Sequence, residues 1–221
     1  MKVEQQQVEI IPLHSTPIIK TNIGRDFTKD EIKCFQDIPL ERQKQGQGIG
    51  GKGQSNHQSV SFTLFENCPS LYDVQKFCKH TLKIYLKEIE GVNTDLAGLK
   101  ITQSWLNKNK PSEGHSPHTH SNSIISGVFY IKCLPNDCIN LQNNHFRLYN
   151  TMEFPIMKST LWNTSNYAQD VIAGDLILFP SWMSHFVSPN ETKDKERISL
   201  AFNTFPIGEL GNSQHATHLV L

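Results

Sequence analysis

Three of the ten histidines lie within one short stretch of the sequence, at His115, His118 and His120. His118 and His120 are two positions apart, and side chains at that spacing point to the same face of an extended chain. Neutral imidazole is a common ligand for iron, zinc, copper and nickel, so this pair could supply two ligands to one metal ion. The spacing alone is equally compatible with a histidine-rich turn in solvent.

Two later segments carry residues of the same chemical interest. His185 stands among aromatic and apolar residues, where the simplest alternative to a metal ligand is a core histidine bonded to the backbone. Segment 197–203 alternates, with Arg197 and Ser199 on one face and apolar side chains on the other. An arginine among small and polar residues would line a cavity and could bind a carboxylate through two hydrogen bonds. The alternative is an arginine in an ordinary surface ion pair.

Short strands must position these residues. Turn-forming Pro, Asn, Gly and Asp separate the strands that we expect at 99–106, 124–133, 138–142, 146–149, 170–173, 175–179, 185–188 and 197–203. Many short strands separated in this way are typical of a β-sandwich or a barrel.

The part of the chain before these strands has a different pattern. We expect a strand around a turn at 8–19 and a polar loop at 41–59. Between them, residues 28–38 are typical of a short helix, with Thr28 as its N-cap and Glu31 in position to complete a capping box.

The clearest helix of the sequence spans 70–90, where apolar residues recur at helical spacing. Ser70 and Asp73 form a candidate capping box at its start, and Gly91 is expected to end it.

Length and composition indicate one folded domain. The chain has 221 residues and a mass of 25.1 kDa, enough for one sizeable core. We expect a single domain over 1–221, with helices and loops over about 1–95 and a β core over about 96–206. Lys plus Arg and Asp plus Glu both number 21, and this zero net charge argues against general nucleic-acid binding. Twelve Phe, five Tyr and three Trp argue against intrinsic disorder.

Signals for the compartment are weak but consistent. The N-terminus has no apolar run of signal-peptide length, and no window approaches the roughly 18 apolar residues that a membrane span needs. The five cysteines are widely spread and form no Cys-x-x-Cys motif, which is typical of free thiols in a reducing compartment. We therefore expect a cytoplasmic protein without a membrane partner.

The order of the motifs is more specific than any one of them. The chain reads H-x-x-H-x-H at 115–120, S-G-V-F-Y at 126–130, G-D-L-x-x-F-P-S-W-x-x-H-x-V at 174–187 and R-x-S-x-x-F-N at 197–203, with S-W-x-N just upstream at 104–107. This series resembles the iron(II)- and 2-oxoglutarate-dependent oxygenases, in particular a subgroup with the same succession of motifs. The resemblance is dense over about 99–205 and loose over the N-terminal half.

The resemblance implies a mainly β fold, a double-stranded β-helix (a jelly-roll, cupin-like barrel) with flanking N-terminal helices. It also implies a set of site residues. The metal ligands would be His118, His120 and His185. Arg197 would bind the distal carboxylate of 2-oxoglutarate with Ser199 as a second donor, while Tyr130 and Asn107 are weaker candidates for the same co-substrate that could instead serve packing.

One position departs from the wider family, whose first metal motif is H-x-D/E. His120 stands where the acid would be, so three neutral imidazoles would leave iron(II) with its full +2 charge. Three-histidine iron sites are also known from thiol dioxygenases, which need no 2-oxoglutarate; Arg197 and Ser199 favour the 2-oxoglutarate enzyme. His115 is five positions from His120 and faces the opposite side of a strand, so we expect it in contact with substrate, behind the ligands or in solvent.

The implied activity is that of an iron(II) dioxygenase of the hydroxylase type, which uses O2 and 2-oxoglutarate and produces succinate and CO2. Its substrate would be a small molecule or a peptide, and the sequence is compatible with a homodimer. Segments 46–54 and 142–169 are the expected places for substrate contacts or a lid. Two alternatives stay open: a three-histidine, cupin-like iron dioxygenase that does not use 2-oxoglutarate, and a non-catalytic jelly-roll that binds a metal or a ligand.

Apolar walls are expected around the implied site. The residues that we place there are Val128, Phe129, Leu178, Phe179 and Trp182.

Overall fold

The structure, a computed structural model, describes residues 15–43, 56–142, 158, 160 and 164–221. Its strands form two antiparallel sheets. The larger sheet has the order β1 (Ile19–Asn22), β9 (Asp175–Pro180), β6 (Ile125–Lys132), β11 (Arg197–Leu210), β4 (Ala97–Asn109), β3 (His57–Ser59) and β2 (Leu40–Arg42), with β12 (Leu219–Val220) beside β11. The smaller sheet has the order β5 (His115–His118), β10 (His185–Val187), β7 (Cys138–Gln142) and β8 (Asn166–Asp170).

From β4 onward the chain passes back and forth between the two sheets. Strands β4, β6, β9 and β11 lie in the larger sheet, whereas β5, β7, β8 and β10 lie in the smaller one. This alternation is the connectivity of a jelly-roll, and it confirms the mainly β fold with N-terminal helices that the sequence predicts.

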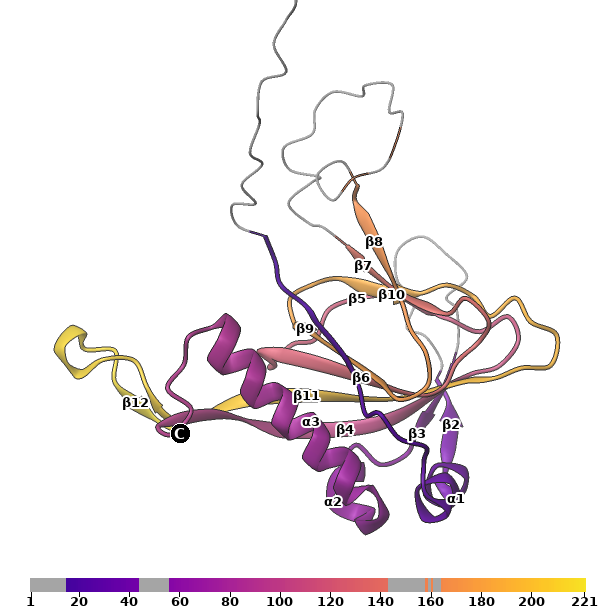
Figure 1. Cartoon of the computed structure of the whole chain (residues 1–221), viewed down its shortest axis with the longest axis horizontal. Helices are drawn as coiled ribbons and strands as arrows, with labels where there is room; N and C mark the ends of the chain where they lie inside the picture. The colour runs from indigo at the N-terminus through magenta and orange to yellow at the C-terminus, as the bar shows by residue number, and fades with distance from the viewer. Residues whose placement is uncertain (1–14, 44–55, 143–157, 159, 161–163) are drawn as a thin grey trace, which may run out of the picture.

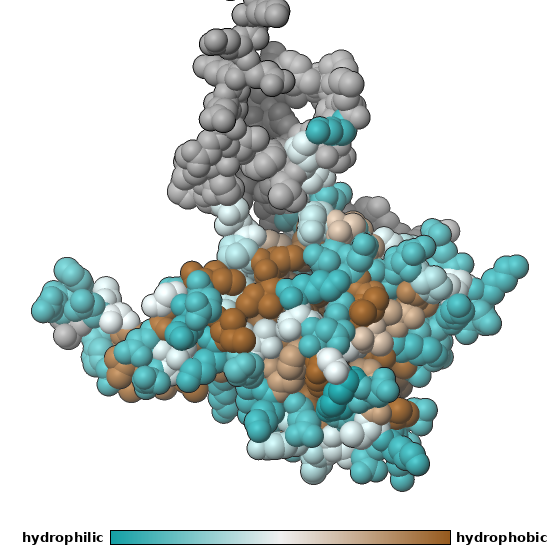
Figure 2. All heavy atoms as spheres, in the orientation of Figure 1, coloured by the Kyte–Doolittle hydropathy of each residue, from teal (hydrophilic) through white to brown (hydrophobic). Residues whose placement is uncertain are grey.

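Helices cover one face of the larger sheet. They are α1 (Lys29–Asp37), α2 (Leu64–Asn67) and α3 (Tyr72–Ile84), with the short helical turns η1 (Pro69–Leu71) and η2 (Tyr85–Ile89). A further short turn, η3 (Ser213–His215), lies near the C-terminus and is not part of this layer. Figure 1 shows α3 along this face beside β4 and β11, with the smaller sheet on the other side of the larger one. On the face shown in Figure 2, apolar side chains alternate with polar ones over the helices and the sheet. Within the described residues, no helix combines the length and the apolar character needed to cross a membrane.

Two cores follow from the alternation of side chains along the strands. One lies between the helices and the larger sheet, where Leu200 and Phe202 of β11 pack with Val74 and Leu82 of α3. The other lies between the sheets and includes Tyr130 and Ile177. Strands β6 and β9 therefore have one face against the helices and one face toward the interior of the barrel.

The two helix starts differ from each other. At α1 the predicted capping box is confirmed, because Thr28 Oγ1 accepts from the Glu31 N–H and the Glu31 carboxylate accepts from the Thr28 N–H. At the second helix the predicted capping box at Ser70 is wrong, and α3 begins without a side-chain cap. Pro69 starts a 3-10 turn there, which places Ser70 inside the turn and not before it.

Several predicted strands agree with the structure and others do not. The predicted loop at 41–59 is partly wrong, because its two ends pair as β2 and β3. The predicted strand at 170–173 is also wrong: β8 ends at Asp170, and Gly174 turns the chain with a φ of +88°. The strand predicted at 146–149 and the first part of the one at 8–19 lie outside the described residues.

Candidate metal centre

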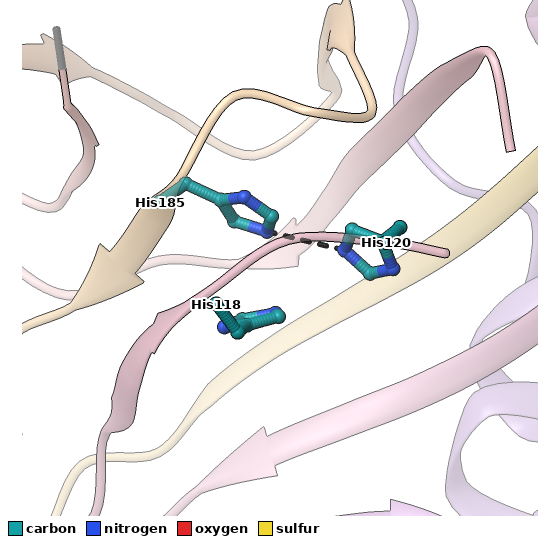
Figure 3. Close-up of side chains that lie close together, drawn as sticks. All are labelled: His118, His120 and His185. Carbon is teal, nitrogen blue, oxygen red and sulfur yellow. Dashed lines mark hydrogen bonds between the residues drawn. The ribbon is translucent and has the colours of Figure 1, made fainter. Parts of the chain in front are cut away.

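The ring nitrogens of three histidines, His118, His120 and His185, come together where β5 and β10 pair. Strands β5 and β10 are antiparallel neighbours, and their register sets His118 opposite His185. His120 follows β5 in a turn, where its backbone N–H donates to the Ser181 carbonyl at 3.0 Å. In each residue a ring nitrogen lies within 4.8 Å of the nitrogens of the other two, and Figure 3 shows the three rings gathered around one space.

The spacing of the rings suits one metal ion. The Nε2 atoms of His120 and His185 lie 3.2 Å apart. Two imidazoles bound to one ion at right angles, each with a metal–nitrogen distance of about 2.1 Å, would hold their nitrogens about 3.0 Å apart. The ring centroid of His118 lies 4.3 Å from that of His185 and 5.2 Å from that of His120. The donor set of three imidazoles fits iron, zinc or nickel.

The environment keeps His120 and His185 neutral, and backbone carbonyls orient His118 and His185. Burial lowers the pKa of His120 to about 4 and the pKa of His185 to about 3, with a further lowering by His118 nearby. Nδ1 of His185 lies 3.1 Å from the Met183 carbonyl, and Nδ1 of His118 lies 2.8 Å from the Ser116 carbonyl. A carbonyl can only accept, so both Nδ1 atoms carry a proton, and Nε2 of the neutral His185 presents a lone pair.

A polar network that sequence reasoning missed supports the turn at His120. Ser181 Oγ lies 2.8 Å from Ser126 Oγ, and Ser126 Oγ donates to Asn203 Oδ1 at 3.1 Å. Ser181 Oγ also donates to Ser123 Oγ at 2.7 Å. Ser126, Ser181 and Asn203 fall inside the sequence motifs, but only the tertiary structure shows that they meet each other and Ser123.

A second cluster lies on the interior face of the larger sheet, around Arg197. Its side chain is only 2% exposed, so the surface ion pair considered from the sequence is wrong. Nε of Arg197 lies 3.0 Å from Oδ2 of Asp137, whose side chain is 6% exposed. Cζ of Arg197 lies 5.2 Å from the ring centroid of Tyr130. This makes a buried ion pair stacked against an aromatic ring.

The strand register gathers the other predicted co-substrate residues here. Ser199 is opposite Asn107 on β4 and opposite Tyr130 on β6, so the three side chains share the interior face. Oδ1 of Asn107 accepts from Asn56 Nδ2 at 3.2 Å. Burial raises the pKa of the Tyr130 hydroxyl, which is therefore a neutral donor.

Unpartnered polar atoms mark this cluster as a place for a ligand. The hydroxyl of Tyr130 and both amide atoms of Asn109 are buried without a hydrogen-bond partner among the described residues. Asn109 is the residue opposite Arg197 in the β4–β11 pair, and sequence reasoning missed it. A buried polar group without a partner is unfavourable by about 1–3 kcal/mol. A polar ligand that formed hydrogen bonds with these atoms would remove that unfavourable free energy.

The two clusters share the barrel interior. Trp105 lies on the same face of β4 as Asn109, and its ring centroid lies 5.7 Å from that of His120. His115 lies outside the cluster of three nitrogens, but both His118 and Arg197 act on its charge. Burial is the main cause that lowers the pKa of His115 to about 3. His115 is therefore a neutral side chain beside the metal centre, with its ring centroid 6.1 Å from that of His118.

Two of the five residues that we expected in the apolar walls face the interior. Val128 and Phe179 belong to the interior core, and the Phe179 ring centroid lies 4.6 Å from that of His185. Phe129 and Leu178 pack instead against the helices, because each is one position from an interior residue and so faces the other side. Trp182 is half exposed. Segment 46–54 and most of 142–169, where we expected substrate contacts, lie outside the described residues.

Comparisons with known proteins agree with this arrangement. Residues 103–203 match the model of the family described as "Putative 2OG-Fe(II) oxygenase". A prolyl hydroxylase from Trichoplax adhaerens, in complex with a peptide fragment of hypoxia inducible factor, has a similar structure: 12% identity, a TM-score of 0.58, and coverage of 87% of this chain and 85% of that chain. An oxidoreductase of the 2OG-Fe(II) oxygenase family from Burkholderia pseudomallei gives 11% identity, a TM-score of 0.56 and coverage of 85% and 84%. No curated protein matches this sequence.

Proposed function

We propose that the chain belongs to the 2OG-Fe(II) oxygenases, whose family model matches residues 103–203, and that it is an iron(II)- and 2-oxoglutarate-dependent dioxygenase of the hydroxylase type. Bound iron(II) would supply the activation of O2, coupled to conversion of 2-oxoglutarate into succinate and CO2. The protein binds the reactants, orients them and keeps the interior dry.

His118, His120 and His185 are the proposed metal ligands. The two Nδ1 atoms that donate to backbone carbonyls fix the rings of His118 and His185 and leave Nε2 as the atom that each residue offers to a metal ion. The wider family has an acid where this chain has His120, so the metal centre here has one negative charge fewer. A centre with more positive charge favours the binding of a dianionic co-substrate.

Arg197 is the proposed partner of the distal carboxylate of 2-oxoglutarate. Its guanidinium is buried, so its attraction for a carboxylate is weakly screened by solvent. Ser199 and the neutral Tyr130 hydroxyl would donate further hydrogen bonds, and the Asn107 amide stands next to them on β4. These donors would hold the co-substrate between Arg197 and the histidines.

One observation carries this proposal: the barrel that brings three imidazoles together, of which His185 is buried, also holds a buried arginine beside an unpartnered tyrosine hydroxyl. A three-histidine dioxygenase without 2-oxoglutarate has no need for such an arginine pocket, and a purely structural metal site has no need for one either. The substrate is proposed to be a small molecule or a peptide. A homodimer stays a prediction.

The test uses the purified protein loaded with iron(II) under argon. Addition of 2-oxoglutarate should produce a weak visible charge-transfer band, and exposure to air should yield succinate. If neither the band nor succinate is found while iron is bound, the proposal is wrong, and the dioxygenase without 2-oxoglutarate becomes the better explanation. If iron is not bound at all, the proposed ligand set fails.

A further inference from the structure

We infer that Asp137 is a positioning residue, which holds Arg197 by its Nε side and leaves the two Nη groups to bind the co-substrate. The inference rests on the function proposed for Arg197. Its starting point is the contact of 3.0 Å between Arg197 Nε and Asp137 Oδ2, formed by two side chains that are 2% and 6% exposed. A buried carboxylate against the proposed carboxylate-binding arginine requires an explanation.

Asp137 is fixed by the backbone around it. Its N–H donates to the Leu134 carbonyl at 3.3 Å, and its own carbonyl accepts from the Val171 N–H at 2.9 Å. Asn136 adopts a φ of +55°, which closes the turn between β6 and β7. Oδ2 of Asp137 also accepts from the Leu134 N–H at 3.3 Å. Two backbone hydrogen bonds therefore hold the Asp137 main chain, and a third, from the Leu134 N–H, holds its carboxylate.

Arg197 contacts Asp137 through its Nε side. Its Nε lies at ion-pair distance from Asp137, but the Nε–H is not aligned for a hydrogen bond. A guanidinium has five N–H donors, and its two Nη groups can grip a carboxylate side by side. The contact with Asp137 therefore leaves a binding edge intact.

The charge balance shows why Asp137 acts through position and not through attraction. Asp137 neutralises Arg197 and so makes a buried cation tolerable when no co-substrate is bound. It also brings a negative charge toward a dianionic co-substrate, which cannot by itself improve binding. What it can supply is a fixed direction for the guanidinium. The negative charge of Asp137 and the position of its oxygen atom therefore have separate effects on co-substrate binding.

Two substitutions test that distinction. One oxygen, Oδ2, contacts both Leu134 and Arg197, so an amide oxygen can replace it. Asp137→Asn should therefore keep the affinity for 2-oxoglutarate within about threefold, whereas Asp137→Ala should weaken it by about tenfold or more. Asp175→Ala is the matched control, because Asp175 is also a buried acid that pairs with a cation, Lys20. It should destabilise the fold without changing that affinity.

The measurement is calorimetric titration of the iron(II) protein under argon with 2-oxoglutarate and with 2-oxobutyrate, which has the keto acid end but no distal carboxylate. Asp137→Ala should lose affinity for 2-oxoglutarate alone. An equal loss for both acids, a loss in Asp137→Asn equal to that in Asp137→Ala, or a loss in Asp175→Ala of the same size would overturn the inference.

Other results would show that the function proposed for Arg197 is itself wrong. If the wild-type protein binds 2-oxobutyrate as tightly as 2-oxoglutarate, or if Arg197→Lys leaves 2-oxoglutarate affinity unchanged, Arg197 does not bind the distal carboxylate, and the role of Asp137 falls with it. If Arg197→Lys weakens binding while Asp137→Ala has no effect, only the inference about Asp137 is wrong. Asp137→Ala combined with Arg197→Lys should bind no more weakly than Arg197→Lys alone.

Discussion

Nε2 of His120 lies 3.2 Å from Nε2 of His185, although 65 positions separate the two residues in the sequence. Without a metal ion, a neutral His120 that carries its proton on Nε2 can donate it to Nε2 of His185 across this distance. With the His120 proton on Nδ1 instead, both Nε2 atoms present lone pairs, and the same spacing suits a shared metal ion.

The first prediction concerns metal binding. His120→Ala and His185→Ala should each abolish stoichiometric iron(II) binding, whereas His115→Ala and the exposed His80→Ala should bind it fully, because His115 and His80 lie outside the cluster. Metal at 100 times its dissociation constant should raise the free energy of unfolding of the wild type by about 2.7 kcal/mol. Metal analysis after gel filtration and denaturant titration measure the two effects. Full iron content in His120→Ala would contradict the ligand set.

Tyr130→Phe should have opposite effects on stability and on binding. The hydroxyl of Tyr130 is buried without a partner, so its removal should leave the free energy of unfolding unchanged or raise it by about 1 kcal/mol. The same change should weaken 2-oxoglutarate binding by roughly tenfold, because a charge-assisted hydrogen bond is lost.

The matched control for Tyr130 is Tyr85, whose hydroxyl donates to the Pro17 carbonyl at 3.2 Å. Tyr85→Phe should lower the free energy of unfolding by about 1 kcal/mol and leave co-substrate affinity unchanged. Urea denaturation and calorimetry distinguish the pair. A stable Tyr130→Phe variant with wild-type affinity would remove Tyr130 from the binding site.

Gly127 should not tolerate a side chain. A Cβ at this position would lie 2.1 Å from the ring of Phe202, which is fully buried under the helices. We expect Gly127→Ala to lower the free energy of unfolding by at least about 2 kcal/mol. At Gly98 the nearest atom would be 3.8 Å away, so Gly98→Ala should be neutral or slightly stabilising. Equal stability of the two variants in urea would show that Phe202 can move aside.

The capping box of α1 should make stability depend on pH. Arg25, which donates to Glu31 through both Nη atoms, is the largest cause that lowers the pKa of Glu31 below 4.5. A lowered pKa in the folded state means that the stabilisation is present above the unfolded pKa and is lost as the pH falls through the folded pKa.

Glu31→Gln should therefore lower the free energy of unfolding by about 1 kcal/mol at pH 7 and by progressively less below about pH 4. The effect is modest because solvent screens Arg25, whose side chain is 34% exposed. The exposed Glu66→Gln serves as the control. A difference between Glu31→Gln and wild type that stays constant from pH 7 to pH 3 would exclude this ion pair as its source.

Local pattern in the sequence determined the features that depend on neighbours along the chain. Alternation over 197–203 predicted that Arg197 and Ser199 face away from Leu200 and Phe202, and the two cores bear this out. The capping box at Thr28 followed in the same way, because its hydrogen bonds span only three positions. Strand and helix periods are local quantities, and a single sequence contains them.

Tertiary structure decided the features that depend on which strands pair. The register of β5 against β10 brings His118 to His185, and the turn between β6 and β7 brings Asp137 to Arg197. The sequence motifs pointed to the first contact through resemblance and gave no sign of the second. Phe129 was misplaced because alternation shows that neighbouring residues face opposite sides, but not which side is the interior. That choice is made by the whole fold, since the helices and the smaller sheet compete for the two faces of the same strands.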